Sequence, residues 1–178
     1  SVSVAVYWFA VRAGQVLFVL LALSIFLAVG GLSVLREPSI GVLTGLSAIP
    51  ALALAGYVWY SDVTTSEPLS LLAVTFILGL LTAGFAAVVN SFLQPVFTAF
   101  GGVGMVLFFY VVVGPVEETV KLLAVRLYAY NDSRFAAVID GAVYGAVAGL
   151  GFATIENAIY ITGAIEDVGG LSLGLDLI

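Results

Sequence analysis

Long stretches of this sequence contain no charged residue, and this restricts the chain to helices that can cross a lipid bilayer. The run from Gly14 to Leu35 covers 22 residues without one Asp, Glu, Lys or Arg. About 20 consecutive apolar residues are enough for an α-helix to span the hydrocarbon core. Charged residues make up only 9% of the whole chain, whereas a soluble domain carries about 25%. The sequence therefore predicts an integral membrane protein surrounded by a lipid bilayer.

Breaks between the apolar runs predict an all-α fold, a polytopic transmembrane helix bundle that forms a single domain over residues 1–178. We expect five spans and then an acidic tail, at about 14–35, 38–60, 68–93, 103–130, 134–161 and 166–178. The residues from Asn90 to Gly104 are rich in helix breakers, which predicts a short loop or a re-entrant turn. Gly114 and Pro115 predict a broken or kinked helix within the fourth span.

The distribution of charge predicts the orientation and excludes one class of partner. Arg12, Arg126 and Arg134 lie on one side of the predicted spans. Arg36 lies alone on the other side. Cytoplasmic loops carry an excess of Lys and Arg, so we expect the N-terminus and the turn at Asn131 to lie on the cytoplasmic side of the cell membrane. The net charge of −6 argues against a nucleic-acid partner.

Ionisable residues nevertheless occur inside the apolar sequence of the fourth and fifth spans. They are Glu117, Glu118, Lys121, Asp140 and Glu156. An ionisable side chain at bilayer depth costs about 2.5–3.5 kcal/mol on insertion, so by default it indicates a functional site. Lys121 follows the two adjacent glutamates by four and three residues, and on a helix it can reach either. Such a group can hold a general base beside a carboxyl that stays protonated. The alternative is a helix start at the membrane interface, with solvated charges.

The fifth span adds a carboxylate beside an amide, at Glu156 and Asn157. This pair suits metal coordination, water activation or hydrogen bonding to a peptide carbonyl. The alternative is a helix end at the interface. Small residues recur every four positions along the same span, which predicts a face for close approach of another helix. They are Ala137, Gly141, Gly145, Gly149 and Ala153.

Helix geometry limits which of these groups can meet. Asp140 and Glu156 are 16 residues apart, about 24 Å along a helix, so they cannot share one compact site. A hairpin folded at Asn131 predicts an ion pair between Lys121 and Asp140. For Glu117 to reach Glu156, the fifth helix must tilt or break at residues 149–151, and we expect the break.

In combination, three motifs resemble the signature of the PrsW family of intramembrane proteases, which are distant relatives of the CAAX-prenyl and abortive-infection protease superfamily. The motifs are Glu117-Glu118-x-x-Lys121, Asp140-Gly141-x-x-Tyr144-Gly145 and Phe152-x-x-x-Glu156-Asn157-x-x-Tyr160. The resemblance implies a multi-pass, metal-dependent protease that cuts a membrane-protein substrate such as an anti-sigma factor. It implies that the catalytic and metal-binding carboxylates are Glu117, Glu118 and Glu156. Residues expected to support them are Lys121, Asn157, Asp140, Phe152 and Tyr160.

The family pattern continues with a histidine motif in a later helix, and this chain contains no histidine. Zinc prefers nitrogen and sulfur ligands, whereas carboxylates alone suit harder cations. We therefore expect the divalent metal to be zinc if a histidine-bearing helix lies beyond this chain. Otherwise the protein departs from the chemistry of the family.

Two other classes of function fit the same residues. A proton- or ion-coupled transporter also places carboxylates and broken helices at the middle of the membrane. A catalytically inactive scaffold subunit would dock through the small residues of the fifth span. The clustering of carboxylates, an amide and a lysine favours the protease.

Overall fold

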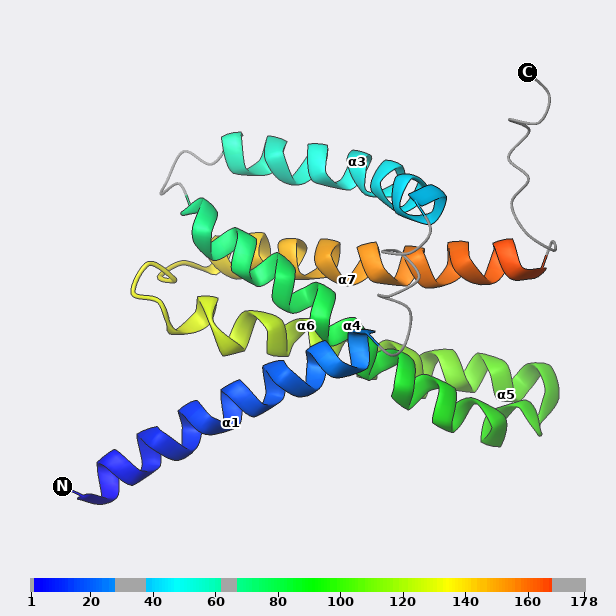
Figure 1. Ribbon diagram of the computed structural model, residues 1–178, viewed down its shortest axis with the longest axis horizontal. Coiled ribbons are helices and arrows are strands. Elements are labelled where there is room, and N and C mark those ends of the chain that lie inside the picture. The colour runs from blue at the N-terminus through cyan, green and yellow to red at the C-terminus, as the bar shows by residue number, and fades with distance from the viewer. Residues whose placement is uncertain (1, 28–37, 62–66, 168–178) are drawn as a thin grey trace.

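The computed structural model describes residues 2–27, 38–61 and 67–167, and these residues form a helical bundle (Figure 1). The elements in chain order are α1 (Val2–Phe26), α3 (Pro38–Ser61), α4 (Leu69–Thr98), α5 (Gly101–Phe108), the π-helical segment η2 (Phe109–Val113), α6 (Gly114–Leu127), the 3-10 turn η3 (Ala129–Asn131) and α7 (Val138–Asp167). No strand occurs within the described ranges, and the all-α prediction is confirmed.

Among the residues that the structure describes, four helical segments are long and apolar enough to cross a membrane. They are Pro38–Tyr57, Leu69–Thr98, Gly101–Asn131 and Val138–Ile165. The apolar part of α1, Ala10–Phe26, is shorter than these four segments. Of the span predicted at 14–35, the part from residue 28 onward lies outside the described residues. Many large apolar side chains lie exposed on these helices. Such faces are stable in lipid, which is as apolar as they are.

Helices α4, α6 and α7 form the core of the bundle. α4 contacts both of the others, α3 packs along α7, and α1 packs on α4 (Figure 1). α6 and α7 run antiparallel. One buried cluster joins the three core helices near the α6–α7 connection and contains Leu71, Leu72, Leu78, Ala124, Val125, Ala129, Val143, Tyr144 and Ala148. A second cluster lies further from that connection and contains Ala83, Ala86, Val120, Phe152 and Ile155.

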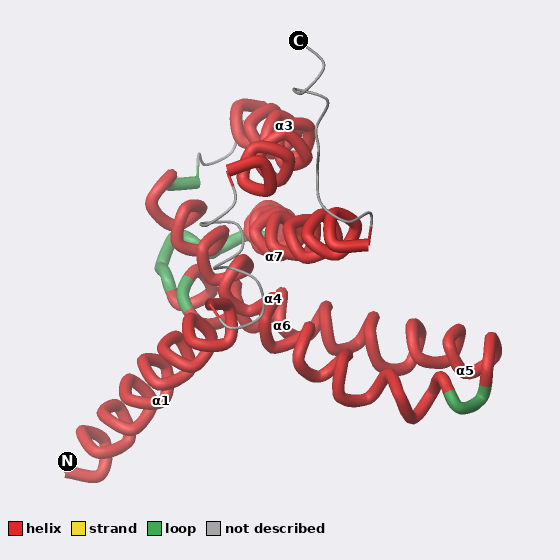
Figure 2. The backbone as a smooth tube through the Cα atoms, turned by 45° about the vertical axis from the view of Figure 1, so that its right-hand side comes forward, coloured by secondary structure: helices red, strands yellow, loops and turns green. Residues whose placement is uncertain are grey.

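Helix α4 passes through the segment that was expected to be a loop. The helix continues beyond Asn90 and includes Pro95, and it ends at Thr98. The prediction of a loop starting at Asn90 is therefore wrong, because a continuous helix satisfies its own backbone groups in lipid and this outweighs the weak helix formers. The chain turns only after Thr98, where Gly101 adopts a left-handed φ of 63° that side chains disfavour. The resulting α4–α5 hairpin diverges from α7 (Figure 2).

The predicted kink near Gly114 and Pro115 is confirmed. Residues Gly101–Leu127 form one bent helix in which η2 joins α5 to α6. The amide of Gly114 donates to the carbonyl of Phe109, five residues back, as in a π-helix. Pro115 has no N–H and follows directly, at the start of α6. The helix therefore changes its hydrogen-bond register here without ending.

Helix α7 is continuous from Val138 to Asp167, so the expected break at residues 149–151 is wrong. Instead, Gly151 lies against α4, where an added Cβ would overlap the backbone carbonyl of Phe76. A Cβ on Gly79 of α4 would likewise overlap the carbonyl of Ala148. By contrast, a Cβ on Gly145 or Gly149 meets no atom within 4 Å. The packing face of α7 is therefore not the predicted row of small residues.

This contact generates a matched test on one helix. Gly151→Ala places a methyl group against the backbone of α4, and overpacking of this kind costs about 1–3 kcal/mol. Gly149→Ala adds the same methyl group in open space and gains helix propensity, about 1 kcal/mol. We expect Gly151→Ala to lower the midpoint of thermal unfolding in detergent micelles and Gly149→Ala to leave it unchanged or raise it. Equal midpoints for the two variants would contradict the close approach at Gly151.

Candidate active site

A cavity of about 410 Å³ lies between the second half of α4, the bent helix and α7. Glu117, from the first turn of α6, and Glu156, from α7, both line it. The two carboxylates are close enough for Coulombic repulsion. The remaining polar lining comes mostly from α4, and the apolar lining includes Phe108, Phe109, Phe152 and Ile159. The structure thus brings together two of the three carboxylates that the sequence predicted for the site.

The level of the two carboxylates follows from the antiparallel pairing of α6 and α7. Lys121 Nζ lies 4.5 Å from the centre of the Phe152 ring, so these residues are level. Glu117 lies one helical turn from Lys121 on α6, and Glu156 lies one helical turn from Phe152 on α7. Both turns lead away from the α6–α7 connection, so the two carboxylates are also level. The break expected at residues 149–151 is not needed for them to meet, because residues 128–137 do not form a tight turn at Asn131. They contain η3 and a further non-helical stretch, which changes the register of α7 against α6.

Lys121 forms ion pairs within its own helix. Its Nζ lies 3.7 Å from Glu117 Oε2 and 2.8 Å from Glu118 Oε1. The predicted pair with Asp140 is wrong, since Phe152 is 12 residues beyond Asp140 along α7, about 18 Å. The Glu118 side chain is 74% exposed and lines a different cavity of about 640 Å³, together with Lys121. Glu118 therefore reaches the Glu117–Glu156 cavity only through Lys121.

The other predicted supporting residues divide between this cavity and elsewhere. Phe152 is buried in its wall, and Tyr160 is largely exposed at its edge. Asn157 instead donates from Nδ2 to Ser47 Oγ of α3 at 3.1 Å, which ties α3 to α7. Asp140 lies at the opposite end of α7 and is considered below. The structure therefore places Phe152 and Tyr160 with the carboxylates and separates Asn157 from them.

The donor set does not fit a metal by itself. In the part of the chain that the structure describes, no three Asp, Glu, His or Cys side chains lie together as a metal site. A catalytic zinc ion takes three protein ligands, and the cavity provides two carboxylates. The predicted metal-binding set of Glu117, Glu118 and Glu156 is not assembled here, because Glu118 lines the other cavity.

Comparison with known proteins identifies the family. The sequence model of the PrsW family of intramembrane metalloproteases matches residues 67–177, which is more than half of the chain. The chain belongs to the PrsW family. The matched residues include α4, the bent helix and α7, which together line the cavity, whereas α1 and α3 lie outside the match.

Several curated relatives carry the same name, Protease PrsW. The protein from Bacillus subtilis is 32% identical over 114 residues, which cover 64% of this chain and 51% of the relative. That from Geobacillus kaustophilus is 34% identical, with 63% and 48% covered, and that from Clostridioides difficile is 32% identical, with 65% and 49% covered. This PrsW-family chain thus spans about half the length of the curated relatives it matches. No solved structure matches it significantly.

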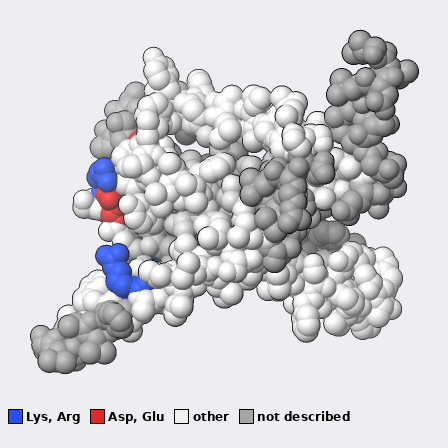
Figure 3. Space-filling model, viewed as in Figure 1, with Lys and Arg blue, Asp and Glu red and all other residues white. Residues whose placement is uncertain are grey.

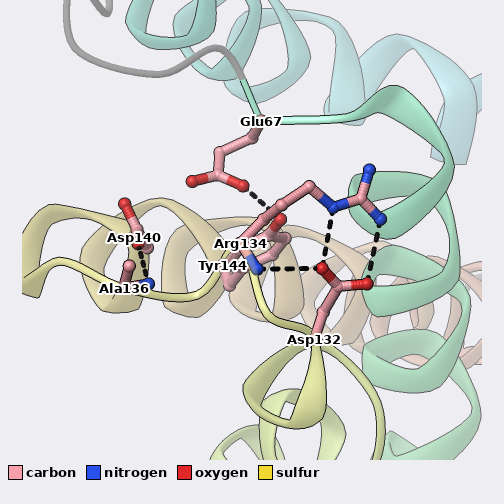
Figure 4. Close-up of polar contacts among 6 residues, drawn as sticks. All are labelled: Glu67, Asp132, Arg134, Ala136, Asp140 and Tyr144. Atoms are coloured by element: carbon pink, nitrogen blue, oxygen red, sulfur yellow. Dashed lines mark hydrogen bonds and ion pairs between the residues drawn. The ribbon is translucent and has the colours of Figure 1, made fainter.

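A second polar group, drawn in Figure 4, lies near the α6–α7 connection and shares no residue with the lining of the cavity. The Tyr144 hydroxyl donates to the carboxylate of Glu67, just before α4, and both residues are buried. Trp59 Nε1 of α3 donates to the carbonyl of Glu67 at 2.9 Å. Glu67 is not among the residues that the sequence motifs predicted for a site. Its position directly before Pro68 and α4 is the signal that could have indicated an anchored helix start.

The same end of the PrsW-family bundle carries two carboxylates with structural roles. Buried Asp140 accepts hydrogen bonds from the backbone amides of Ala136 and Ala137, each at 2.7 Å, at the start of α7. Asp132 lies in the connection, and hydrogen bonds from Arg134 lower the pKa of its carboxyl to about 2. Figure 3 shows Lys and Arg atoms grouped at this end of the molecule. These contacts fix the connection before α7.

The Tyr144–Glu67 hydrogen bond leads to a test of stability. Tyr144→Phe leaves a buried carboxylate with one donor fewer, and hydrogen bonds to charged groups contribute about 1.5–3 kcal/mol. We expect the free energy of unfolding to fall by that amount, measured as a lower midpoint of thermal unfolding in detergent. Tyr57→Phe, at an exposed position on α3, serves as the control and should leave the midpoint unchanged. An unchanged midpoint for Tyr144→Phe would show that the bond contributes no net stability.

Proposed function

We propose that this protein is an intramembrane protease, and that the cavity between α4, the bent helix and α7 is its active site. The observation that carries the proposal is the presence of Glu117 and Glu156 in one cavity. The chain belongs to a family that is described as intramembrane metalloproteases. Its curated relatives are named proteases. This chain spans about half the length of those relatives, and the complete reaction is therefore part of the proposal.

The depth of the cavity supports hydrolysis inside the membrane. Glu117 precedes the end of α6 at Leu127 by ten residues, which corresponds to about 15 Å along the helix axis. The hydrocarbon core of a bilayer is about 30 Å thick. The carboxylates therefore lie near its middle, where ionisable side chains are costly and usually functional.

A facing carboxylate pair can carry out both proton transfers of peptide hydrolysis. In this mechanism Glu117 takes a proton from a water molecule while the water oxygen attacks the peptide carbonyl carbon. Glu156 gives a proton to the leaving nitrogen as the C–N bond breaks. Lys121 holds the Glu117 side chain through the ion pair at 3.7 Å. Glu118 acts through Lys121 as a positioning residue.

The metal ion and the substrate are proposed from the family and from the residues that the chain contains. The family description implies a metal ion. Zinc would need nitrogen ligands that this chain, which lacks histidine, does not contain. A membrane-tethered regulator such as an anti-sigma factor is the substrate that the resemblance implies.

Charge at one end of the bundle supports an orientation in the cell membrane. Gln15 Nε2 of α1 donates to the Leu127 carbonyl at 3.4 Å, and Arg12 lines a cavity with the same two residues. The basic residues of α1 and of the α6–α7 connection therefore lie at one end. By the positive-inside rule we propose that this end, with the N-terminus, faces the cytoplasm.

The assignment is tested with the full-length protein in liposomes. The probe is a single-span peptide labelled with a fluorophore and a quencher on opposite sides of a helix-destabilising centre. We expect Glu117→Gln and Glu156→Gln each to reduce cleavage by at least about 100-fold, the usual contribution of a general acid or base. Glu118→Gln should cause a smaller loss, because Lys121 keeps its contact with Glu117.

Tyr60→Phe is the control, since it removes an exposed hydroxyl from α3, away from the cavity. It should leave cleavage unchanged, and mass spectrometry of the two fragments identifies the bond that is cut. Cleavage by Glu117→Gln at the wild-type rate would overturn the assignment of the general base.

A further inference from the structure

The wall of the cavity opposite the two carboxylates is polar and uncharged. Asn90, Ser91 and Gln94 of α4 line it, whereas Glu117 and Glu156 come from α6 and α7. Asn90 and Gln94 are one helical turn apart and therefore share a face of α4. None of the three belongs to the motifs that identified the site.

Asn90 carries a buried polar atom without a partner. Among the described residues, its Oδ1 is inaccessible to solvent and accepts no hydrogen bond. The hydroxyls of Thr82 and Thr98 on the same helix instead donate to backbone carbonyls one turn back. An unpaired buried amide oxygen is costly, especially at bilayer depth. Asn90 thus lowers the stability of the folded protein, as expected of a residue that is kept for binding.

We propose that Asn90 and Gln94 bind the backbone of the substrate peptide and position its scissile bond in front of Glu117 and Glu156. This inference rests on the proposed function. A carboxamide has both an acceptor oxygen and donor N–H groups, so it complements the C=O and N–H of a peptide group. A substrate helix that unwinds in the membrane exposes such groups, and they must find partners inside the protein.

The charge of the cavity favours a peptide over other occupants. The α4 wall carries no cation that would attract a lipid phosphate, and the opposite wall carries two carboxylates that would repel it. Phe108 and Phe109 provide apolar surface beside the polar groups, which suits the side chains of a membrane-spanning substrate. Ser91 lies next to Asn90 and extends the polar surface of the same wall.

The first measurement separates binding from catalysis. Asn90→Leu and Gln94→Met keep the side-chain volume and remove the hydrogen-bonding groups. With the same quenched single-span peptide in liposomes, we expect each variant to raise KM about tenfold, as for loss of one hydrogen bond. We expect kcat to stay within about threefold, as for binding shared by the ground and transition states. In the Glu117→Gln background, the Kd of the uncleaved peptide should rise by the same factor.

Phe92→Leu is the matched control, because Phe92 lies on the exposed face of α4 outside the cavity. It should leave KM, kcat and Kd unchanged. An unchanged KM and Kd in Asn90→Leu, or a loss confined to kcat, would overturn the binding role while the proposed protease function stands. If Glu117→Gln cleaves the peptide at the wild-type rate, the carboxylate assignment fails instead. A wild-type protein that neither binds nor cleaves the peptide would overturn both.

Thermal unfolding separates a binding role from a structural one. Because Asn90 Oδ1 has no partner within the described structure, Asn90→Leu should keep or raise the midpoint of thermal unfolding of the full-length protein. Removing an unpaired buried polar group in favour of an apolar one of the same shape is neutral or stabilising. A lowered midpoint in Asn90→Leu would indicate a structural role and would overturn the inference.

Discussion

The close packing of α7 against α4 is the contact on which the rest of the structure depends. Where lipid surrounds the helices, there is little hydrophobic drive for them to associate, so backbones must approach closely to gain dispersion contacts. Gly79 and Gly151 provide this approach, each against the backbone of the facing helix. They hold α7 beside α4 as far as Gly151, and the α4–α5 hairpin diverges from α7 (Figure 2). The cavity opens where that contact ends.

The opposite end of the bundle sets the register of the same two helices. The Tyr144–Glu67 hydrogen bond joins the second turn of α7 to Glu67, two residues before the start of α4. Asp140 fixes the start of α7 through the backbone of Ala136 and Ala137. A shift of α7 by one residue would rotate Glu156 by about 100° around its helix and out of the cavity. The buried polar groups near the connection thus help to keep the two carboxylates facing each other.

Sequence reasoning located the two carboxylates but not the geometry that joins them. Charged residues in apolar helices are easy to recognise in a sequence, and they are rare at membrane depth unless they have a function. The register of α6 against α7 depends on the connection at residues 128–137, whose path follows from tertiary contacts and not from local propensity. The row from Gly141 to Gly149 misled for a similar reason, since spacing shows which residues share a face but not which face is covered. Asn90 was missed because its neighbours are weak helix formers that lipid nevertheless keeps helical.

The irregular backbone of the bent helix converges on the same cavity. Gly114 donates to the carbonyl of Phe109 and not to that of Tyr110. Pro115 has no N–H to donate to Val111, so two successive carbonyls lose the donors that an α-helix would supply. Backbone of this kind is tolerated at membrane depth only where it is buried in protein or lines a water-filled cavity. Phe109 and Val113, at the two ends of η2, line the cavity that holds the carboxylates and Asn90. An irregular backbone, an unpaired side-chain oxygen on Asn90 and two acids at one depth are each unfavourable in lipid. Their coincidence is explained if water and an unwound peptide are what the cavity contains when the protein works.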